Sequence, residues 1–164
     1  MCGIAGLCVA SSQTRADLEH IAIKMGSAIG HRGPDSSGVY AAIDLGVALS
    51  HQRLAILDIS ASGHQPMQSS TGRYIIAFNG EIYNHLSLRD ELDALSPGPI
   101  WHGHSDTETL LSAIEAWGLE IALQRSVGMW GLALLDLLEK RLYLARDRFC
   151  LLYTSDAADD TPCV

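Results

Sequence analysis

Short apolar runs bounded by turn-forming residues occur toward both ends of this sequence, and helical patterns lie between them. Runs of this length are typical of buried strands. We expect strands at 3–10, 38–44, 46–58, 73–80, 128–136 and 141–147. Helices grouped among short strands with tight turns are typical of α+β domains, in which sheets and helices pack as layers. We therefore expect the α+β class.

Apolar residues spaced three or four apart predict helices in the intervening segments. We expect helices at 15–30, 86–95, 109–117 and 119–124. The third has the clearest boundaries, because Ser105 and Glu108 form an S-x-x-E capping box and Gly118 fits the C′ position. The strand at 73–80 ends in Asn-Gly, a pair that favours a hairpin turn.

The composition narrows the class of protein further. Of 164 residues, 48% are hydrophobic and 18% charged, which suits a soluble globular domain. A net charge of −8 argues against a nucleic-acid partner. No segment approaches the ~20 apolar residues of a membrane span, and no basic region precedes the first apolar run as in a signal peptide. The four cysteines form no CxxC pair, so we expect a cytoplasmic protein without a membrane partner.

Cys2 lies directly behind the initiator methionine. Its small side chain permits removal of Met1, which would leave a thiol and a free α-amino group on one terminal residue. Unperturbed, these groups titrate near ~8.5 and ~7.7–8.0, so one residue could supply both a nucleophile and its base. The alternative is that Cys2 is simply a small apolar residue entering a strand.

Six motifs occur in order over residues 1–108, and a seventh, ARDRF, follows near the end. The six are MCGIAG, HRGPDSSG, LSHQRLAILD, GHQPM, FNGEIYN and SDTE. Together they closely resemble the glutaminase domain of glutamine-hydrolysing asparagine synthetases, which are class II amidotransferases of the N-terminal-nucleophile superfamily. The resemblance extends to Phe149. It implies a four-layer αββα sandwich of the N-terminal-nucleophile hydrolase type, truncated at its C-terminus.

The resemblance also implies catalytic roles. Cys2 would attack the side-chain amide of glutamine, form a γ-glutamyl thioester and release ammonia, with its own α-amino group as the base. The side chain of Asn79 and the backbone N–H of Gly80 would form the oxyanion hole. The competing interpretation of Asn79 and Gly80 is a plain type I′ hairpin turn.

Substrate binding is implied for a second set of residues. Arg53 would hold the substrate α-carboxylate with both arms of its guanidinium. Asp106 would hold the α-ammonium, with Glu81 close by. Backbone atoms of residues Leu54, Ala55, Ile56 and Leu57 would line the pocket. Asp106 also fits the first turn of a helix, where a carboxylate is stabilised by the helix dipole, and both roles are compatible.

His102, His104 and Asp106 match an H-x-H-x-D run, which is a candidate metal site. Metallo-hydrolases with that run continue with a further histidine, whereas this chain has Thr107. We expect no metal and no cofactor in this domain.

The resemblance implies that the amide acceptor is handled elsewhere. Asparagine synthetases carry a C-terminal domain that uses ATP and Mg²⁺ to amidate aspartate, and the full-length enzyme would be a possible homodimer. No S-G-G-x-D-S signature occurs in this sequence. Two alternatives remain open: the glutaminase domain of an amidotransferase with another acceptor, or an inactive truncated fragment.

Residues 150–164 lack both the helical and the strand periodicity. The family pattern also calls for glycine where this chain has Cys150. We therefore expect an incomplete amidotransferase domain at 2–149, followed by a non-native tail at 150–164.

Overall fold

The structure is a computed structural model that describes residues 2–10, 14–55 and 61–148. Its strands are β1 (Gly3–Cys8), β2 (Ser36–Ala42), β3 (Val47–Arg53), β4 (Met67–Gln68), β5 (Tyr74–Ile82), β6 (Gly128–Asp136) and β7 (Arg141–Arg146). Its α-helices are α1 (Arg15–Ala28), α2 (His85–Asp93), α3 (Asp106–Trp117) and α4 (Leu119–Arg125). Short 3₁₀ turns lie at Gly30–Arg32, Ile43–Leu45 and Ala61–Gly63.

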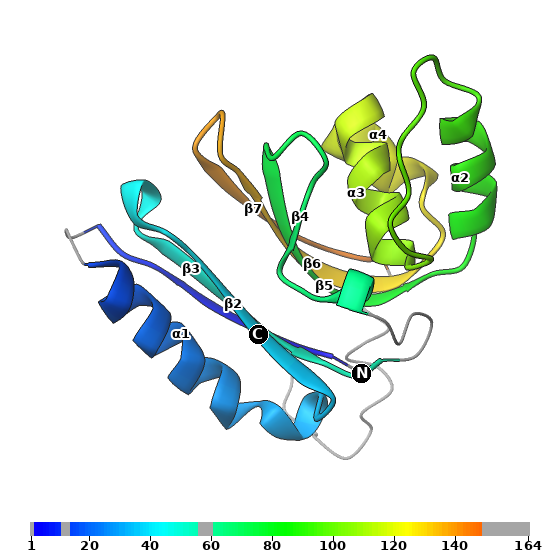
Figure 1. Cartoon of the computed structure of the whole chain (residues 1–164). Coiled ribbons are helices and arrows are strands. Elements are labelled where there is room, and N and C mark those ends of the chain that lie inside the picture. Colours follow the sequence, from blue (N-terminus) through cyan, green and yellow to red (C-terminus); the bar gives the residue numbers. More distant parts are fainter. Residues whose placement is uncertain (1, 11–13, 56–60, 149–164) are drawn as a thin grey trace.

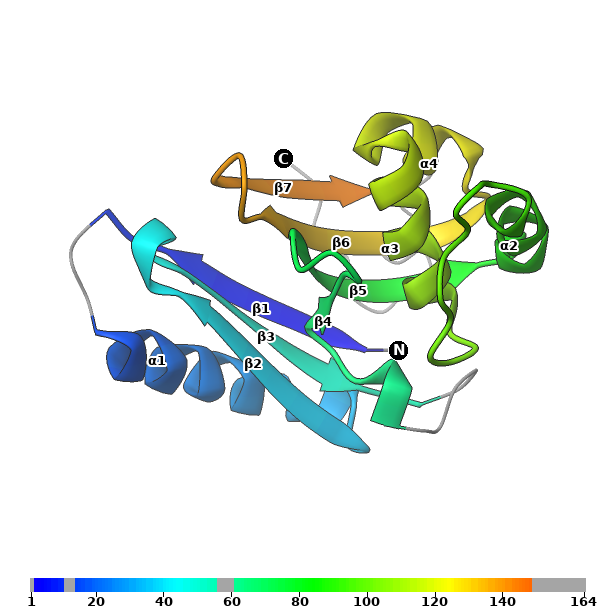
Figure 2. The same cartoon turned by 45° about the horizontal axis from the view of Figure 1, so that its top comes forward.

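The described strands form two antiparallel sheets, which face each other across an apolar layer (Figures 1 and 2). The first sheet has the order β1-β3-β2, and the second has the order β4-β5-β6-β7. Helix α1 covers the outer face of the first sheet, while α2, α3 and α4 cover the outer face of the second (Figure 2). Helix, sheet, sheet and helices thus follow one another as layers, in agreement with the expected α+β class.

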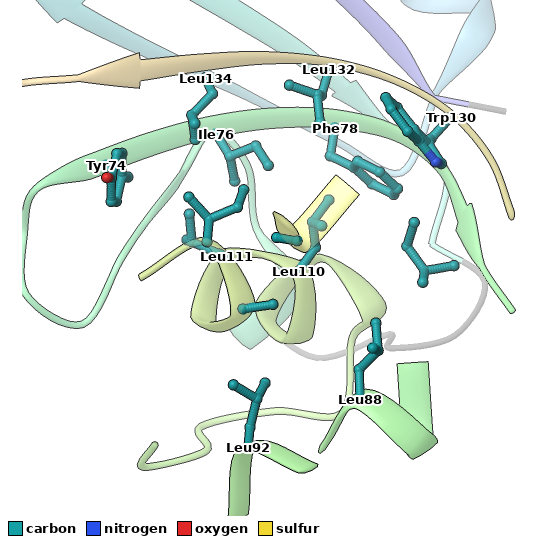
Figure 3. Close-up of a cluster of buried hydrophobic side chains, with 14 residues drawn as sticks. Tyr74, Ile76, Phe78, Leu88, Leu92, Leu110, Leu111, Trp130, Leu132 and Leu134 are labelled. Carbon is teal, nitrogen blue, oxygen red and sulfur yellow. The ribbon is translucent and has the colours of Figure 1, made fainter. Parts of the chain in front are cut away.

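Side-chain alternation in the strands explains this layering, because successive residues point to opposite faces. On β5, Ile75 and Ala77 face the first sheet, whereas Ile76 and Phe78 pack against the helices. Figure 3 shows Phe78, Leu132 and Leu134 of the second sheet above Leu110 and Leu111 of α3, with Leu88 and Leu92 of α2 beyond them. Both faces of the second sheet are therefore buried, which accounts for its continuous apolar runs.

The expected elements appear with a few shifted boundaries. Helix α3 begins at Asp106, directly after the predicted cap Ser105 and three residues ahead of the expected range 109–117. The Ser105 side chain accepts a hydrogen bond from the N–H of Glu108. The Glu108 carboxylate does not complete a capping box; it accepts hydrogen bonds from the N–H groups of His102 and Gly103 instead. Gly118, with φ of +84°, ends the helix.

Two strand expectations are wrong. The strand expected at 46–58 ends at Arg53, and residues 56–58 lie outside the described residues. Asn79 and Gly80 form no hairpin turn, because β5 continues through them to Ile82 and pairs with β6 along its whole length. Pairing with a long neighbouring strand outweighs the local preference of Asn-Gly for a turn here. Among the helices of the described residues, none combines the length and the apolar composition that a membrane span requires.

Candidate active site

Cys2 lies just ahead of β1, on the face of the first sheet that looks toward the second. Ile4 packs into the layer between the sheets, and alternation gives Cys2 the same direction. Its sulfur accepts a hydrogen bond from the N–H of Leu54 at 3.4 Å and lies 3.6 Å from the carbonyl oxygen of the same residue. The thiol is half-buried and forms no disulfide. It is therefore held against the backbone just beyond β3, yet stays accessible.

The segment after β3 is braced by Asp35 of the HRGPD motif. The Asp35 carboxylate accepts a hydrogen bond from the N–H of Ala55 at 2.7 Å, and its own N–H donates to the Arg53 carbonyl at 3.0 Å. Arg53 is the last residue of β3 and shares the inward face of Val47 and Leu49. The two bonds of Asp35 set the position of Arg53 and of the backbone that contacts the thiol.

One edge of β5 presents a row of backbone N–H groups toward the N-terminal end of α3. The Phe78 N–H donates to Gln65 Oε1 at 2.6 Å, and the Ile82 N–H donates to Asp106 Oδ2 at 2.8 Å. In an antiparallel strand every second residue directs its N–H and C=O to the same side. Gly80, midway between these two residues, therefore points its N–H toward the same edge.

Trp130 of β6 supports this assignment, since it is the cross-strand partner of Gly80. Its N–H donates to Asp147 Oδ2 at 3.1 Å, and its carbonyl accepts from the Asp147 N–H at 2.8 Å. Both backbone groups of Trp130 are thus directed toward the chain that follows β7. Gly80 and Trp130 form a pair without mutual hydrogen bonds.

Gly80 also satisfies a steric requirement. A Cβ at this position would lie 2.3 Å from the Met129 carbonyl oxygen and 2.6 Å from Cα and Cβ of Trp130. Atoms cannot approach so closely, so any side chain would push β5 away from β6. Asn79, by alternation, faces the first sheet as Ile75 and Ala77 do. Asn79 and Cys2 thus point into the same inter-sheet layer from opposite sheets.

Asp106 is the first residue of α3 and is only 6% exposed. Burial raises the pKa of its carboxyl above the ordinary value, and nearby Glu81 acts in the same direction. Hydrogen bonds from the N–H groups of Ile82 and Thr107 lower this pKa in opposition, as does nearby His85. Burial thus destabilises the ionised form of this carboxyl group, and a cationic group bound beside it would stabilise that form.

The loop ahead of Asp106 is fixed by Arg89 of α2. The Arg89 guanidinium donates to Glu108 Oε2 at 3.0 Å and to the Gly103 carbonyl at 3.0 Å, and it stacks on the Trp101 ring at 4.0 Å. Charge-assisted and cation–π contacts of this kind are stronger than neutral ones. They fix where Asp106 enters the helix.

These elements enclose one cavity of about 110 Å³. Most of the predicted site residues line it, namely Cys2, Arg53, Leu54, Ala55, Asn79, Gly80, Glu81 and Asp106. The predicted pocket residues Ile56 and Leu57 lie outside the described residues. Six further lining residues were not predicted: Gly63, Gln65, Phe78, Ser105, Thr107 and Met129. All of these except Met129 lie inside the quoted motifs, in GHQPM, FNGEIYN or SDTE, but no role at the site had been assigned to them.

The H-x-H-x-D run does not assemble as a metal centre. Its Asp106 carboxylate accepts the Ile82 N–H, and the backbone N–H of His102 donates to Glu108. Over residues 2–10, 14–55 and 61–148, no group of three or more potential ligands is arranged to hold a metal ion.

Comparison with known proteins decides the family. The glutamine amidotransferase domain family matches residues 1–160. This chain belongs to that family. The match confirms the resemblance that the motifs indicated. The predicted site residues Cys2, Asn79 and Asp106 lie around one cavity.

The relatives carry more specific names. An asparagine synthetase (glutamine-hydrolysing) of Bacillus subtilis is 38% identical over 151 residues, covering 91% of this chain and 23% of the relative. The asparagine synthetase of Triphysaria versicolor is 36% identical over 149 residues, covering 91% and 24%. A Mycobacterium tuberculosis protein with a provisional asparagine synthetase name is 39% identical over 160 residues, covering 91% and 24%. The chain spans about a quarter of the length of these relatives.

Proposed function

We propose that this chain is the glutaminase half of an asparagine synthetase and hydrolyses the side-chain amide of L-glutamine. The observation that carries the proposal is the convergence of a thiol, two neutral oxyanion donors and two opposite charges on one cavity. Cys2 comes from one sheet, Asn79 and Gly80 come from the other, and Asp106 comes from the helical layer. The cavity is small, as a single amino acid requires.

Recognition would use the two charges of the amino-acid end of glutamine. The planar guanidinium of Arg53 would bind both oxygens of the α-carboxylate. Asp106 and Glu81 would bind the α-ammonium, and this cation would offset the electrostatic cost of the buried Asp106 carboxylate. A simple amide without these charges would be a poor substrate.

The reaction would begin once Met1 has been removed. The free α-amine of Cys2 takes the thiol proton, directly or through one water, and the thiolate sulfur attacks the carboxamide carbon. The resulting oxyanion accepts hydrogen bonds from the Asn79 side chain and the Gly80 N–H. Collapse of the intermediate breaks the C–N bond, and the α-ammonium returns its proton to the departing nitrogen as ammonia. Water then cleaves the γ-glutamyl thioester, which releases glutamate and restores the thiol.

The observed layers support an N-terminal-nucleophile hydrolase sandwich of the αββα type, with the nucleophile directly ahead of β1. We assign residues 2–149 to this domain, incomplete at its C-terminal end, and residues 150–164 to a non-native tail. Ammonia would serve a synthetase domain that is not part of this chain, where ATP and Mg²⁺ would activate aspartate. We place the reaction in the cytoplasm.

The test is glutamate and ammonia release from glutamine by the purified chain, with asparagine and glutaramic acid as matched amides. Glutaramic acid lacks the α-ammonium and asparagine is one methylene shorter, so both should be hydrolysed far more slowly. Equal turnover of all three amides would contradict the proposal. So would the absence of glutamine hydrolysis by a chain that begins at Cys2.

A further inference from the structure

The edge of β5 that faces the cavity loses its neighbouring strand just before the proposed oxyanion hole. Strand β4 has only two residues, Met67 and Gln68, which pair with Ile76 and Ile75. Phe78 is the next residue that points its backbone groups toward this edge, and β4 does not reach it. A buried strand edge needs other partners, because unpaired backbone groups are costly.

Two side chains take the place of the missing strand. Gln65 Oε1 accepts the Phe78 N–H at 2.6 Å, and His51 Nε2 lies 3.0 Å from the Phe78 carbonyl oxygen. Because a carbonyl oxygen can only accept, His51 is the tautomer that carries its proton on Nε2. Side chains thus hydrogen-bond the peptide groups on both sides of Phe78, the residue directly before Asn79.

These two side chains come from separate layers. His51 belongs to β3 of the opposite sheet and is fully buried. Gln65 precedes β4, and its Nε2 donates to the Thr107 hydroxyl in the first turn of α3 at 3.2 Å. The backbone ahead of Asn79 is therefore fixed to β3 and to α3 at once.

Histidine at position 51 carries a cost that an apolar residue would avoid. Its neighbours on the same face of β3, Val47 and Leu49, are apolar and pack between the sheets. The second ring nitrogen, Nδ1, is buried and has no hydrogen-bond partner among the described residues. Unsatisfied buried polar atoms are rare in folded proteins and destabilise them. A leucine would fill this position without that cost, but it could not donate to Phe78.

We propose that His51 and Gln65 are positioning residues that hold Asn79 and Gly80 in place as oxyanion donors. The proposal rests on the proposed glutaminase function. Neither residue needs to touch glutamine. Catalysis would depend on them because small displacements of oxyanion donors cost much of their effect.

The experiment compares two amides at position 51. In His51→Gln the amide nitrogen is as many bonds from Cα as Nε2 of histidine, so it can still donate to Phe78. In His51→Asn the amide is one bond shorter and cannot. Ser50→Ala is the matched control, because the Ser50 hydroxyl is equally buried and unpartnered on the same strand. The readouts are kcat and KM for glutamine, and the affinity for L-norvaline, which carries the two α-charges but has no oxygen that could reach the oxyanion hole.

We expect His51→Asn to lower kcat about 100-fold, while KM for glutamine and the Kd of L-norvaline change less than about 3-fold. The kcat of His51→Gln should stay within about 5-fold of the wild-type value, and the kcat of Ser50→Ala should equal the wild-type value. A folded His51→Asn variant with wild-type kcat, or equal losses in both amide variants, would overturn the proposal. If His51→Asn does not fold, Gln65→Met is used instead, for which the same selective loss of kcat is expected.

Amide hydrogen exchange separates this proposal from the glutaminase function itself. Exchange in the segment Phe78–Ile82 should be at least about 10-fold faster in His51→Asn than in His51→Gln. If the wild type hydrolyses no glutamine, the proposed function fails, and the exchange comparison still decides whether His51 holds this strand. Equal exchange in both variants would exclude the positioning role whatever the activity.

Discussion

The N–H of Leu54 donates to the sulfur of Cys2 at 3.4 Å, although the two residues are 52 positions apart in the sequence. The contact exists because β1 and β3 pair antiparallel, which brings the residue before β1 beside the residue after β3. The candidate nucleophile is thus positioned by the pairing of the first sheet.

Removal of the Cys2 thiol should abolish glutamine hydrolysis. Cys2→Ala leaves no nucleophile, and Cys2→Ser leaves a hydroxyl that is far less acidic, so both should reduce kcat by at least about 1000-fold. Cys8→Ala is the matched control, because Cys8 is exposed and lies at the far end of β1. Mass spectrometry of the active protein should show a chain that begins at Cys2. Retention of Met1 in a fully active preparation would exclude the α-amine as the base.

Asp35 should matter through its carboxylate oxygen rather than through its charge. Asp35→Asn can still accept the Ala55 N–H, whereas Asp35→Ala cannot, and the backbone that contacts Cys2 would then be less well positioned. We expect Asp35→Ala to slow alkylation of Cys2 by iodoacetamide at least about 10-fold and Asp35→Asn to have a smaller effect. Measurements in a background with Cys8, Cys150 and Cys163 replaced by alanine restrict the signal to Cys2. Identical alkylation rates in the two variants would show that Asp35 does not position this backbone.

The sequence predicted elements well where periodicity is local. Strand β6 and the Ser105 cap of α3 appear as expected, because the apolar run and the cap are each encoded by neighbouring residues. The expected turn at Asn79 and Gly80 failed for the opposite reason. Pairing with β6, whose sequence begins more than 40 residues later, holds these residues in a strand.

Candidate site residues inside recognisable motifs could be predicted from the sequence. The contacts that hold those residues in position could not. Cys2 and Asp106 could be predicted from their motifs. The hydrogen bond between His51 and Phe78 joins two sheets, and no pattern in the sequence predicts it. Gln65 lay inside a motif that assigned it no role. Contacts between layers depend on the fold as a whole, so only the structure reveals them.

Charge recognition should appear in KM. Asp106→Asn keeps an oxygen that can accept the Ile82 N–H but removes the charge, so the helix start should remain while binding of the α-ammonium weakens. Arg53→Ala removes the proposed carboxylate partner. Loss of one partner of such a buried charge pair costs about 2–5 kcal/mol, so each variant should raise KM about 30-fold or more. Arg15→Ala, at an exposed site on α1, is the control. Steady-state kinetics showing unchanged KM in both site variants would place glutamine elsewhere.

Gly80→Ala should impair both stability and activity. The added Cβ would meet the Met129 carbonyl oxygen at 2.3 Å, and backbone cannot yield as a flexible side chain does. Overpacking of this kind costs about 1–3 kcal/mol or more. Gly30→Ala is the control, because a Cβ at Gly30 would have no heavy atom within 4 Å. Thermal unfolding should show a lower midpoint for Gly80→Ala alone. Equal midpoints for the two variants would contradict the close strand contact.

His51 should make the stability of the folded chain depend on pH. Burial lowers the pKa of its imidazole from 6.5 to about 4, and nearby Arg53 and His64 act in the same direction. The hydrogen bond to the Phe78 carbonyl opposes these effects. Between pH 4 and 6.5 the unfolded chain therefore binds more protons than the folded chain. The free energy of unfolding must then fall as pH is lowered through this window.

A comparison of the wild type with His51→Gln isolates this effect, because the substituted amide does not titrate. From pH 7 to pH 4 the wild type should lose up to about 3 kcal/mol more than the variant. The raised pKa of Asp106 has the opposite sign and is common to both proteins, so it cancels in the difference. Urea unfolding at several pH values provides the measurement. Parallel stability curves for the two proteins would mean that His51 titrates normally and that Nδ1 reaches water, in conflict with its burial between the sheets.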